Sequence, residues 1–188
     1  MSPRTVPELT LIAGFDAGQT HTSCRLSEAN SDVVLAEGQG PGLCHLAAPD
    51  GPSRFRRALQ ASLDDACGQL KAQGQLRAAA IGASGIEVGS PVQGEAQALA
   101  SETLGLALPH VVVTGDERTA LRGAMGHHQA GIVVISGTGT IAVGRNAAGI
   151  EHRCAGWGWL LDGAGSAMDL GRDGLSLSLA MADGRQPE

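Results

Sequence analysis

The apolar and polar residues in the first part of the chain alternate in blocks typical of short strands. Three apolar runs, joined by a polar turn at 27–32 and a shorter turn near residue 19, predict successive antiparallel strands at Leu9–Phe15, His21–Leu26 and Val33–Glu37. A loop rich in glycine and proline follows at 38–51. A helix is then expected over 52–73, because apolar residues recur there at helical spacing: Phe55, Leu59, Leu63, Ala66 and Leu70.

Strands and helices continue in alternation to about residue 126. The pattern predicts a strand at 77–83, a helix at 92–106 and a β-branched strand at 110–114. A helix at 116–126 would begin with Asp116 in the N-cap position. The predicted order is βββαβαβα, which indicates an α/β domain over residues 1–126.

The same pattern then restarts. Strands are expected at 131–136 and 140–145 and near 150–153, followed by a helix at 164–182. A second meander followed by a helix predicts a second copy of the domain at 127–188. That copy stops after its first helix, so we expect the chain to be truncated.

Composition limits the classes of protein to consider. With 43% hydrophobic residues in 188 positions, the chain can bury a sizeable core, and its 28 glycines indicate many turns. The net charge of −6 without a long basic cluster argues against nucleic-acid binding. No apolar run approaches the roughly 18 residues of a membrane span, and the first residues lack the apolar core of a signal peptide.

The four cysteines are too widely spaced for a zinc site: Cys24, Cys44, Cys67 and Cys154. Reduced thiols in a cytoplasmic protein are the expectation that fits this spacing.

The stretch IVVISGTGTIAVG at 132–144 places glycines after a strand, as a nicotinamide-binding fingerprint does. That site needs a helix directly after the glycines and an acid about twenty residues on, and the chain offers neither. A β-hairpin whose tip presents backbone N–H groups to an anion fits better. The predicted phosphate-binding residues of this tip are Gly137, Thr138, Gly139 and Thr140. Ordinary strand threonines at 138 and 140 are the alternative.

A similar tip lies between the first two predicted strands, where Gly18, Gln19 and Thr20 follow Asp16. In a duplicated domain the two tips would face each other and hold a nucleoside triphosphate with Mg²⁺. The Asp16 carboxylate would bind the metal directly or through water. The alternative role for Asp16 is to cap the turn.

The chain resembles the N-acetylglucosamine kinase branch of the sugar kinase/Hsp70/actin superfamily, also called BadF-type ATPases. The resemblance covers nearly the whole chain and is carried by five ordered segments: GFDAGQTHT at 14–22, VTGDERTAL at 113–121, ISGTGT at 135–140, CAGWGWLL at 154–161 and GSAMDLGR at 165–172. It implies an actin-like, ribonuclease H-like fold and ATP- and Mg²⁺-dependent phosphorylation of an amino sugar, such as N-acetylglucosamine or glucosamine.

Under this resemblance Asp116 is the base that accepts the proton of the sugar hydroxyl. The residues that it places near the sugar are His45, Ser84, Gly85, Asp116, Thr138, Gly156 and Trp157. Plainer alternatives are helix capping for Asp116, loop packing for Ser84 and Gly85, and core filling for Trp157 and Trp159. His127 and His128 follow a helix end and receive no role in the chemistry.

Three departures from the family leave other functions open. Cys44 stands where the family has a sugar-contacting asparagine, and Gly163 and Ala164 replace two acids, with Asp162 shifted by one position. The chain is also shorter than the family, so we expect an uncovered sheet face, an exposed apolar helix, and a homodimer or a missing C-terminal segment. The alternatives are a non-catalytic sugar-binding or regulatory module, and a BadF-type activator ATPase with an iron–sulfur cluster bound through Cys154.

Overall fold

The structure of the chain is a computed structural model that describes residues 9–31, 33–158 and 160–187. The chain divides into two compact units, Met1–Thr119 and Ala120–Glu188. The division lies within helix α3 (Asp116–Met125). The domain boundary expected between residues 126 and 127 stays a prediction.

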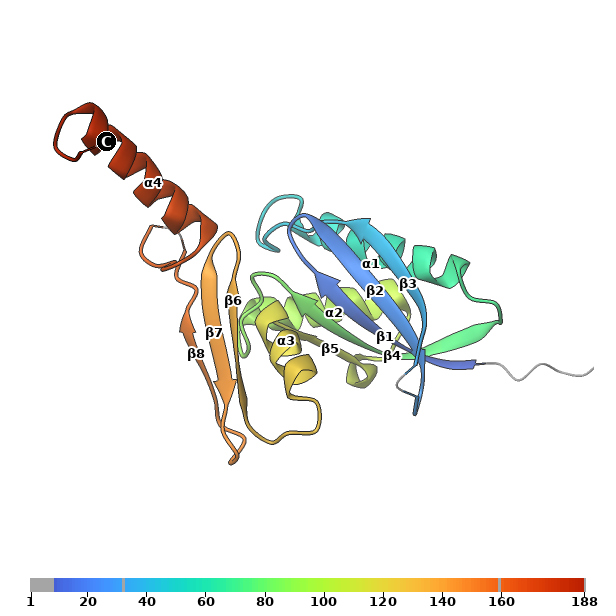
Figure 1. The fold of residues 1–188 in the computed structure, drawn as a ribbon. Helices are drawn as coiled ribbons and strands as arrows, with labels where there is room; N and C mark the ends of the chain where they lie inside the picture. Colours follow the sequence, from blue (N-terminus) through green and yellow to red (C-terminus); the bar gives the residue numbers. More distant parts are fainter. Residues whose placement is uncertain (1–8, 32, 159, 188) are drawn as a thin grey trace, which may run out of the picture. The chain divides into compact units, whose positions relative to one another are not determined.

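The first unit is an α/β layer built on a five-stranded sheet (Figure 1). Its elements are β1 (Leu9–Ala17), β2 (His21–Glu28), β3 (Val34–Pro41), α1 (Gly51–Gly68), β4 (Gly74–Ala83), α2 (Pro91–Leu104), the 3₁₀ helix η1 (Leu108–His110) and β5 (Val111–Thr114). The strand order is β3-β2-β1-β4-β5, with β1 antiparallel to β2 and parallel to β4, and β4 parallel to β5. Together with α3 this confirms the predicted order βββαβαβα.

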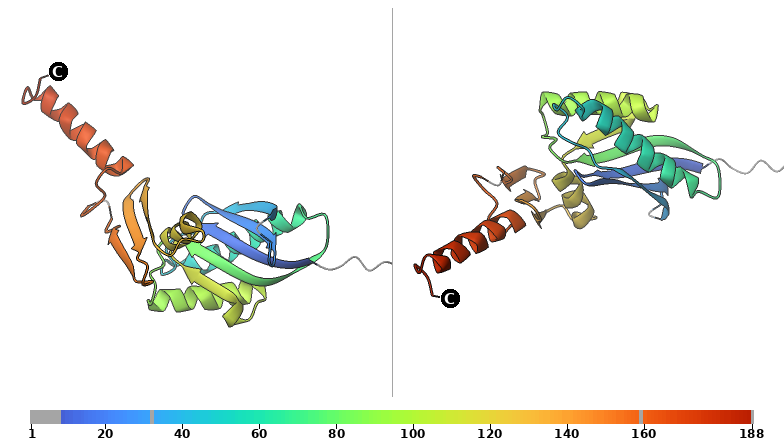
Figure 2. Two further views of the ribbon diagram at one scale, coloured as in Figure 1. Left: turned by 60° about the horizontal axis from the view of Figure 1, so that its bottom comes forward. Right: turned by 90° about the horizontal axis from the view of Figure 1, so that it is seen from above.

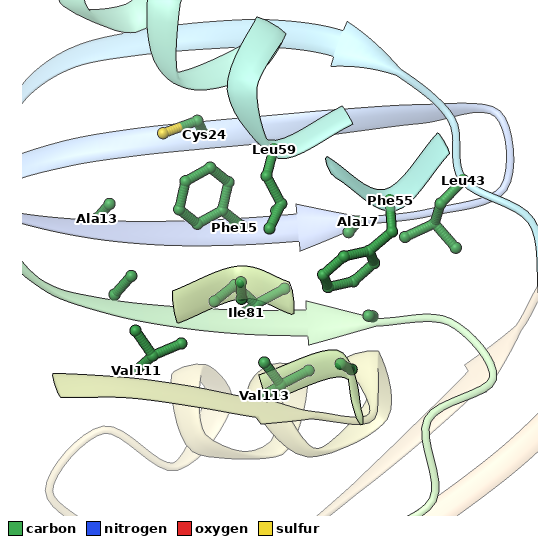
Figure 3. Close-up of a cluster of buried hydrophobic side chains, with 14 of the residues drawn as sticks. Ala13, Phe15, Ala17, Cys24, Leu43, Phe55, Leu59, Ile81, Val111 and Val113 are labelled. Carbon is green, nitrogen blue, oxygen red and sulfur yellow. The ribbon is translucent and has the colours of Figure 1, made fainter. Parts of the chain in front are cut away.

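Buried and exposed side chains alternate along the strands, so the core of this unit lies on one face of the sheet. Phe15 and Ala17 of β1, Ile81 of β4 and Val113 of β5 are buried with Phe55 of α1, as Figure 3 shows. Helices α1 and α2 both lie over this face (Figure 2). Residues between the buried ones, including Asp16, therefore belong to the opposite face.

Two predicted helix boundaries were wrong. Helix α1, expected to reach residue 73, ends at Gly68, because the N–H groups of Gln69 and Leu70 donate to carbonyls three residues earlier, at 3.1 Å each. Leu70 fits the apolar spacing of the helix because it packs against the core from the turn that follows α1. Helix α3 is capped by Gly115, whose carbonyl accepts from the N–H of Arg118 at 3.1 Å, so Asp116 is the first helical residue and not the N-cap.

The second unit holds a three-stranded antiparallel meander followed by one helix. Strands β6 (Gly131–Ser136), β7 (Thr140–Arg145) and β8 (Glu151–Ala155) pair in that order. Val143 of β7 packs with Leu121 and Met125 of α3. Helix α4 (Ala167–Ala182) begins three residues later than predicted, because the side chain of Ser166 caps it by accepting from the N–H of Asp169 at 3.1 Å.

The apolar surface expected in this second unit is present. Ile132 and Val134 of β6 are 78% and 65% exposed, and Leu170 and Leu175 of α4 are 66% and 64% exposed. None of the helices in the described part of the chain is long and apolar enough to cross a bilayer.

Candidate functional site

The three parallel strands of the first unit end in register. Asp16 of β1 pairs with Gly82 of β4, and Gly82 pairs with Thr114 of β5. Neighbouring strands lie about 4.8 Å apart, so the Cα atoms of Asp16 and Thr114 are roughly 10 Å apart. We call this edge, where β1, β4 and β5 end, the carboxyl end of the sheet. Open α/β sheets bind ligands at this edge.

The β1–β2 turn at this edge is the first predicted phosphate-binding tip. The N–H of Gly18 donates to the carbonyl of His21 at 3.0 Å, which closes the turn. The N–H groups of Gln19 and Thr20 donate to no acceptor among the described residues. These two N–H groups are the ones that the turn could offer to an anion.

The loop after β3 packs against this tip. The N–H of Leu43 donates to the carbonyl of Gly18 at 3.0 Å. A Cβ at Gly42 would collide with the backbone of Gln19 and Thr20, so the loop needs glycine for this close approach.

The structure brings His45 together with the residues that follow β4. The Cδ2 atom of His45 lies 3.6 Å from the position that a Cβ of Gly85 would occupy, and Gly85 has φ of +81°. The N–H of Ser84 donates to the carbonyl of Ala17 at 3.0 Å, which ties this loop to the end of β1. Nδ1 of His45 accepts from the N–H of Ala47 at 3.3 Å, so its Nε2 bears the proton and can donate.

Asp116 lies at the same edge, two residues beyond the end of β5, in the first turn of α3. It is half-buried, and its Oδ1 accepts from the N–H of Glu117 at 2.9 Å. One oxygen of this carboxylate is thus fixed by the backbone. Such a carboxylate has the chemistry of a general base.

Sequence reasoning missed Glu117, which is 7% exposed. Its carboxylate packs against Gly115, where a Cβ would collide with it, and its Oε1 lies 4.0 Å from Nε of Arg118. Burial raises the pKa of this carboxyl, and the Asp116 charge adds to the rise, while its backbone hydrogen bond and Arg118 oppose it. Residue spacing could have indicated that Glu117 is buried, because it precedes the buried Leu121 and Met125 by four and eight residues on the same helix.

The residues at this edge fit a magnesium ion that arrives with a nucleotide. Asp16 is exposed and forms no ion pair with any described residue. No group of three or more His, Cys, Asp or Glu side chains is arranged as metal ligands in the described residues. Mg²⁺ usually binds one or two carboxylates together with substrate phosphates and water, so a single carboxylate of this kind suits it.

The second predicted phosphate-binding tip joins β6 and β7 in the other unit. The N–H of Gly137 donates to the carbonyl of Gly139 at 2.9 Å, and the N–H of Ala167, the first residue of α4, donates to the carbonyl of Gly137 at 2.8 Å. The hydroxyl of Thr140 donates to the carbonyl of Ala164 at 3.0 Å. The N–H groups of Thr138 and Gly139 remain without an acceptor among the described residues.

Gly156 and Trp157 lie at the same end of the β6–β8 sheet as this tip. A Cβ at Gly156 would be 3.0 Å from Cδ1 of Ile141, the second residue of β7. Trp157 is 74% exposed, so it does not fill the core, and Arg153 lies over its ring, 5.6 Å from the centroid. Trp159 lies outside the described residues.

Glycine at position 163 has a backbone explanation. Gly163 has φ of +137°, which other residues rarely adopt, so an acidic side chain would be strained there. Asp162 instead holds the loop, because its carboxylate accepts from the N–H groups of Gly163 at 2.7 Å and Trp157 at 3.4 Å.

The predicted site residues therefore gather in two groups. The first unit brings together Asp16, the tip at 18–20, His45, Ser84, Gly85 and Asp116. The second unit brings together the tip at 137–140, Gly156 and Trp157. Their roles, and a ligand shared by the two groups, stay predictions.

Comparison with known proteins identifies relatives along almost the whole chain. A model of the BadF/BadG/BcrA/BcrD ATPase family matches residues 13–188. An N-acetylmuramic acid/N-acetylglucosamine kinase of Clostridium acetobutylicum is 28% identical over 178 residues, covering 93% of this chain and 55% of the relative. The chain thus spans about half the length of that curated relative.

Solved structures show the same fold. A crystal structure from Chromobacterium violaceum, provisionally named an N-acetylglucosamine kinase, is 27% identical with a TM-score of 0.75, covering 97% of this chain and 61% of the other. A structure from Porphyromonas gingivalis with the same provisional name is 22% identical with a TM-score of 0.65, covering 96% of this chain and 58% of the other.

Proposed function

The chain belongs to the BadF/BadG/BcrA/BcrD ATPase family, and from this premise we propose that it is the N-terminal portion of an ATP-dependent amino-sugar kinase. The observation that carries the proposal is the gathering of Asp16, the 18–20 tip and Asp116 at the carboxyl end of β1, β4 and β5. The name of the curated relative supports N-acetylglucosamine or a related amino sugar as the substrate.

In the proposed reaction Asp116 accepts the proton of a sugar hydroxyl while the hydroxyl oxygen attacks the γ-phosphorus of ATP. The bond from that phosphorus to the β–γ bridging oxygen breaks, and ADP leaves. Phosphoryl transfer of this kind depends mainly on positioning and charge stabilisation, with one carboxylate near the nucleophile. Asp116 suits this role because the N–H of Glu117 already fixes its Oδ1 atom and so orients the carboxylate.

The N–H groups of Gln19 and Thr20 in the first unit would bind phosphate oxygens, and those of Thr138 and Gly139 in the second unit have the same capacity. Asp16 would hold Mg²⁺, which neutralises phosphate charge when it is bound. His45 would donate from Nε2 to a sugar oxygen, beside Gly85.

The test is transfer of labelled γ-phosphate from ATP to N-acetylglucosamine, glucosamine or N-acetylmuramic acid, with protein expressed from the complete gene. Asp116→Asn should lower kcat by about 10²–10⁴-fold, because it removes the base but keeps the shape. Asp183→Asn, which removes an exposed carboxylate near the end of α4, is the matched control. Equal kcat in Asp116→Asn and the wild type would show that Asp116 is not the base.

The two alternatives predict other results. A regulatory module would bind the sugar without transferring phosphate. An activator ATPase would contain an iron chromophore and would need clustered ligands beside Cys154, whereas no ligand cluster of three or more occurs among the described residues.

A further inference from the structure

Four basic side chains line one pocket of the second unit. We call it the basic pocket and define it by Arg122, His127, His128 and Arg145; its volume is about 520 Å³. The last turn of α3, the segment after it and the turn between β7 and β8 line this open pocket. No acidic residue lines it.

These basic groups lack acceptors. Nε of Arg145 is buried without a hydrogen-bond partner among the described residues. The side chains of Arg122, His127 and His128 are exposed and form no ion pair or hydrogen bond within the described part of the chain. Glu151 pairs with Arg145 in the strand register but does not line the pocket. Buried donors nearly always have an acceptor, and an anion in the pocket would supply one to Nε of Arg145.

The side chain of Arg145 lies over the β7–β8 turn. Its Nη2 lies 3.3 Å from the position that a Cβ of Gly149 would occupy, and Gly149 has φ of +80°. Asn146 fixes this turn, because its backbone carbonyl accepts from the N–H of Gly149 at 2.9 Å and its side-chain oxygen accepts from the N–H of Ile150 at 2.9 Å.

The basic pocket is separate from the predicted phosphate-binding tip at 137–140. The β6–β7 tip and the β7–β8 turn lie at opposite ends of the three-stranded sheet (Figure 1). Thr140 begins β7 and Arg145 ends it, so roughly 17 Å separates their Cα atoms at about 3.4 Å per residue.

We propose that the basic pocket binds the phosphate group of a small phosphorylated molecule. Two guanidinium groups and two imidazoles around one space match a compact dianion, and arginine binds phosphate oxygens through paired N–H donors. The chain as a whole carries a net charge of −6, whereas the charged and titratable side chains of this pocket are all basic. A volume of about 520 Å³ leaves room beside a phosphate group for an organic part of the ligand.

The experiment measures binding by the 188-residue chain, and its outcome does not depend on kinase activity. Glucose 6-phosphate, inorganic phosphate and glucose are titrated separately by calorimetry at low ionic strength, where charge attraction is least screened. We expect saturable binding of the two phosphates and none of glucose. Tighter binding of glucose 6-phosphate than of inorganic phosphate would identify an organic phosphate as the ligand, and equal affinity would identify free phosphate.

Arg122→Gln and Arg145→Gln should each weaken phosphate binding by about tenfold or more, because each removes a charge-assisted contact. Arg185→Gln, which removes an exposed arginine beyond α4, should leave the affinity unchanged. Arg122 is exposed on α3, so its substitution tests the pocket even if Arg145→Gln fails to fold. Absence of saturable binding, or wild-type affinity in Arg122→Gln and folded Arg145→Gln, would overturn the proposal.

Discussion

At the scale of the residue, Glu117 illustrates how burial changes the chemistry of one carboxyl group. Among the described residues it is the only buried acid, and it follows Asp116 directly in the chain. Burial is the main cause of its raised pKa, and the neighbouring carboxylate of Asp116 adds to the rise. The folded protein therefore holds this proton more tightly than the unfolded chain does.

Glu117→Gln should change how stability depends on pH. Between the ordinary pKa near 4.5 and the raised folded value, the unfolded wild-type chain has lost a proton that the folded state still binds. The free energy of unfolding of the wild type therefore falls as pH rises through this window, since the native state binds more protons. Glutamine has no such proton, so the stability of the variant relative to the wild type should increase with pH.

Urea unfolding of both proteins between about pH 4 and pH 8 measures this difference. Glu87→Gln, which removes an exposed carboxylate in the loop before α2, is the control for loss of a charge. A stability difference between Glu117→Gln and the wild type that does not vary with pH would contradict the raised pKa.

The cysteines should differ in reactivity for the same reason. Burial, with a smaller contribution from Cys67, raises the pKa of Cys24 to about 12, whereas Cys154 is an exposed free thiol. Because the thiolate is the reactive form, a thiol reagent near neutral pH should modify Cys154 and leave Cys24 unmodified until the protein unfolds. Peptide mass spectrometry after brief labelling tests this. Labelling of Cys24 in the native protein at the rate of Cys154 would show that this part of the core opens readily.

At the scale of the element, periodicity predicted which segments are strands and which are helices, but not where α1 ends. Leu70 continued the apolar spacing of α1 because a side chain in a turn can face the same core as the helix before it. Glu117 was missed because an acid in a first helical turn is typical of a solvated helix N-terminus. The position of Asp116 after a strand was predictable, whereas the contact between His45 and Gly85 joins two loops and has no local signal.

The packing of β3 on α1 leads to a prediction about Gly38. A Cβ at this position would collide with the carbonyl oxygen of Ser62 and the backbone nitrogen of Ala66, both in the rigid backbone of α1. Gly38→Ala should therefore lower the free energy of unfolding by about 1–3 kcal/mol or more. Gly94→Ala in α2, where nothing lies within 4 Å, should instead raise it by roughly 0.5–1 kcal/mol. Urea unfolding compares the two variants, and equal effects would contradict the close packing.

At the scale of the whole molecule, the two units differ in how well they bury their apolar side chains. The first unit has a continuous core below α1 and α2, while β6 and α4 of the second unit expose large apolar residues, such as Ile132 and Leu170. Exposed apolar patches favour association. The relatives are longer, and this chain covers 55% of the curated one.

We predict that the isolated 188-residue chain binds ATP weakly, transfers almost no phosphate and associates with itself. The reason is that the second unit, which carries the tip at 137–140, exposes large apolar side chains that favour association. Light scattering, ATP titration and the phosphate-transfer assay measure these three properties. Kinase turnover by a purified 188-residue monomer would refute the prediction.

The irregularities of the five-stranded sheet lie far from the proposed chemistry. Two β-bulges lie near the end of the sheet where β1 and β4 begin. One is an extra residue of β4 opposite Leu11 and Ile12, and the other is an extra residue of β3 opposite Leu26 and Ser27. The strand ends that carry Asp16 and Gly82 keep unbroken pairing. The α1–β4 connection at the irregular end is therefore a suitable place to insert a fluorescent reporter or an affinity tag without altering the loops at the carboxyl end of the sheet.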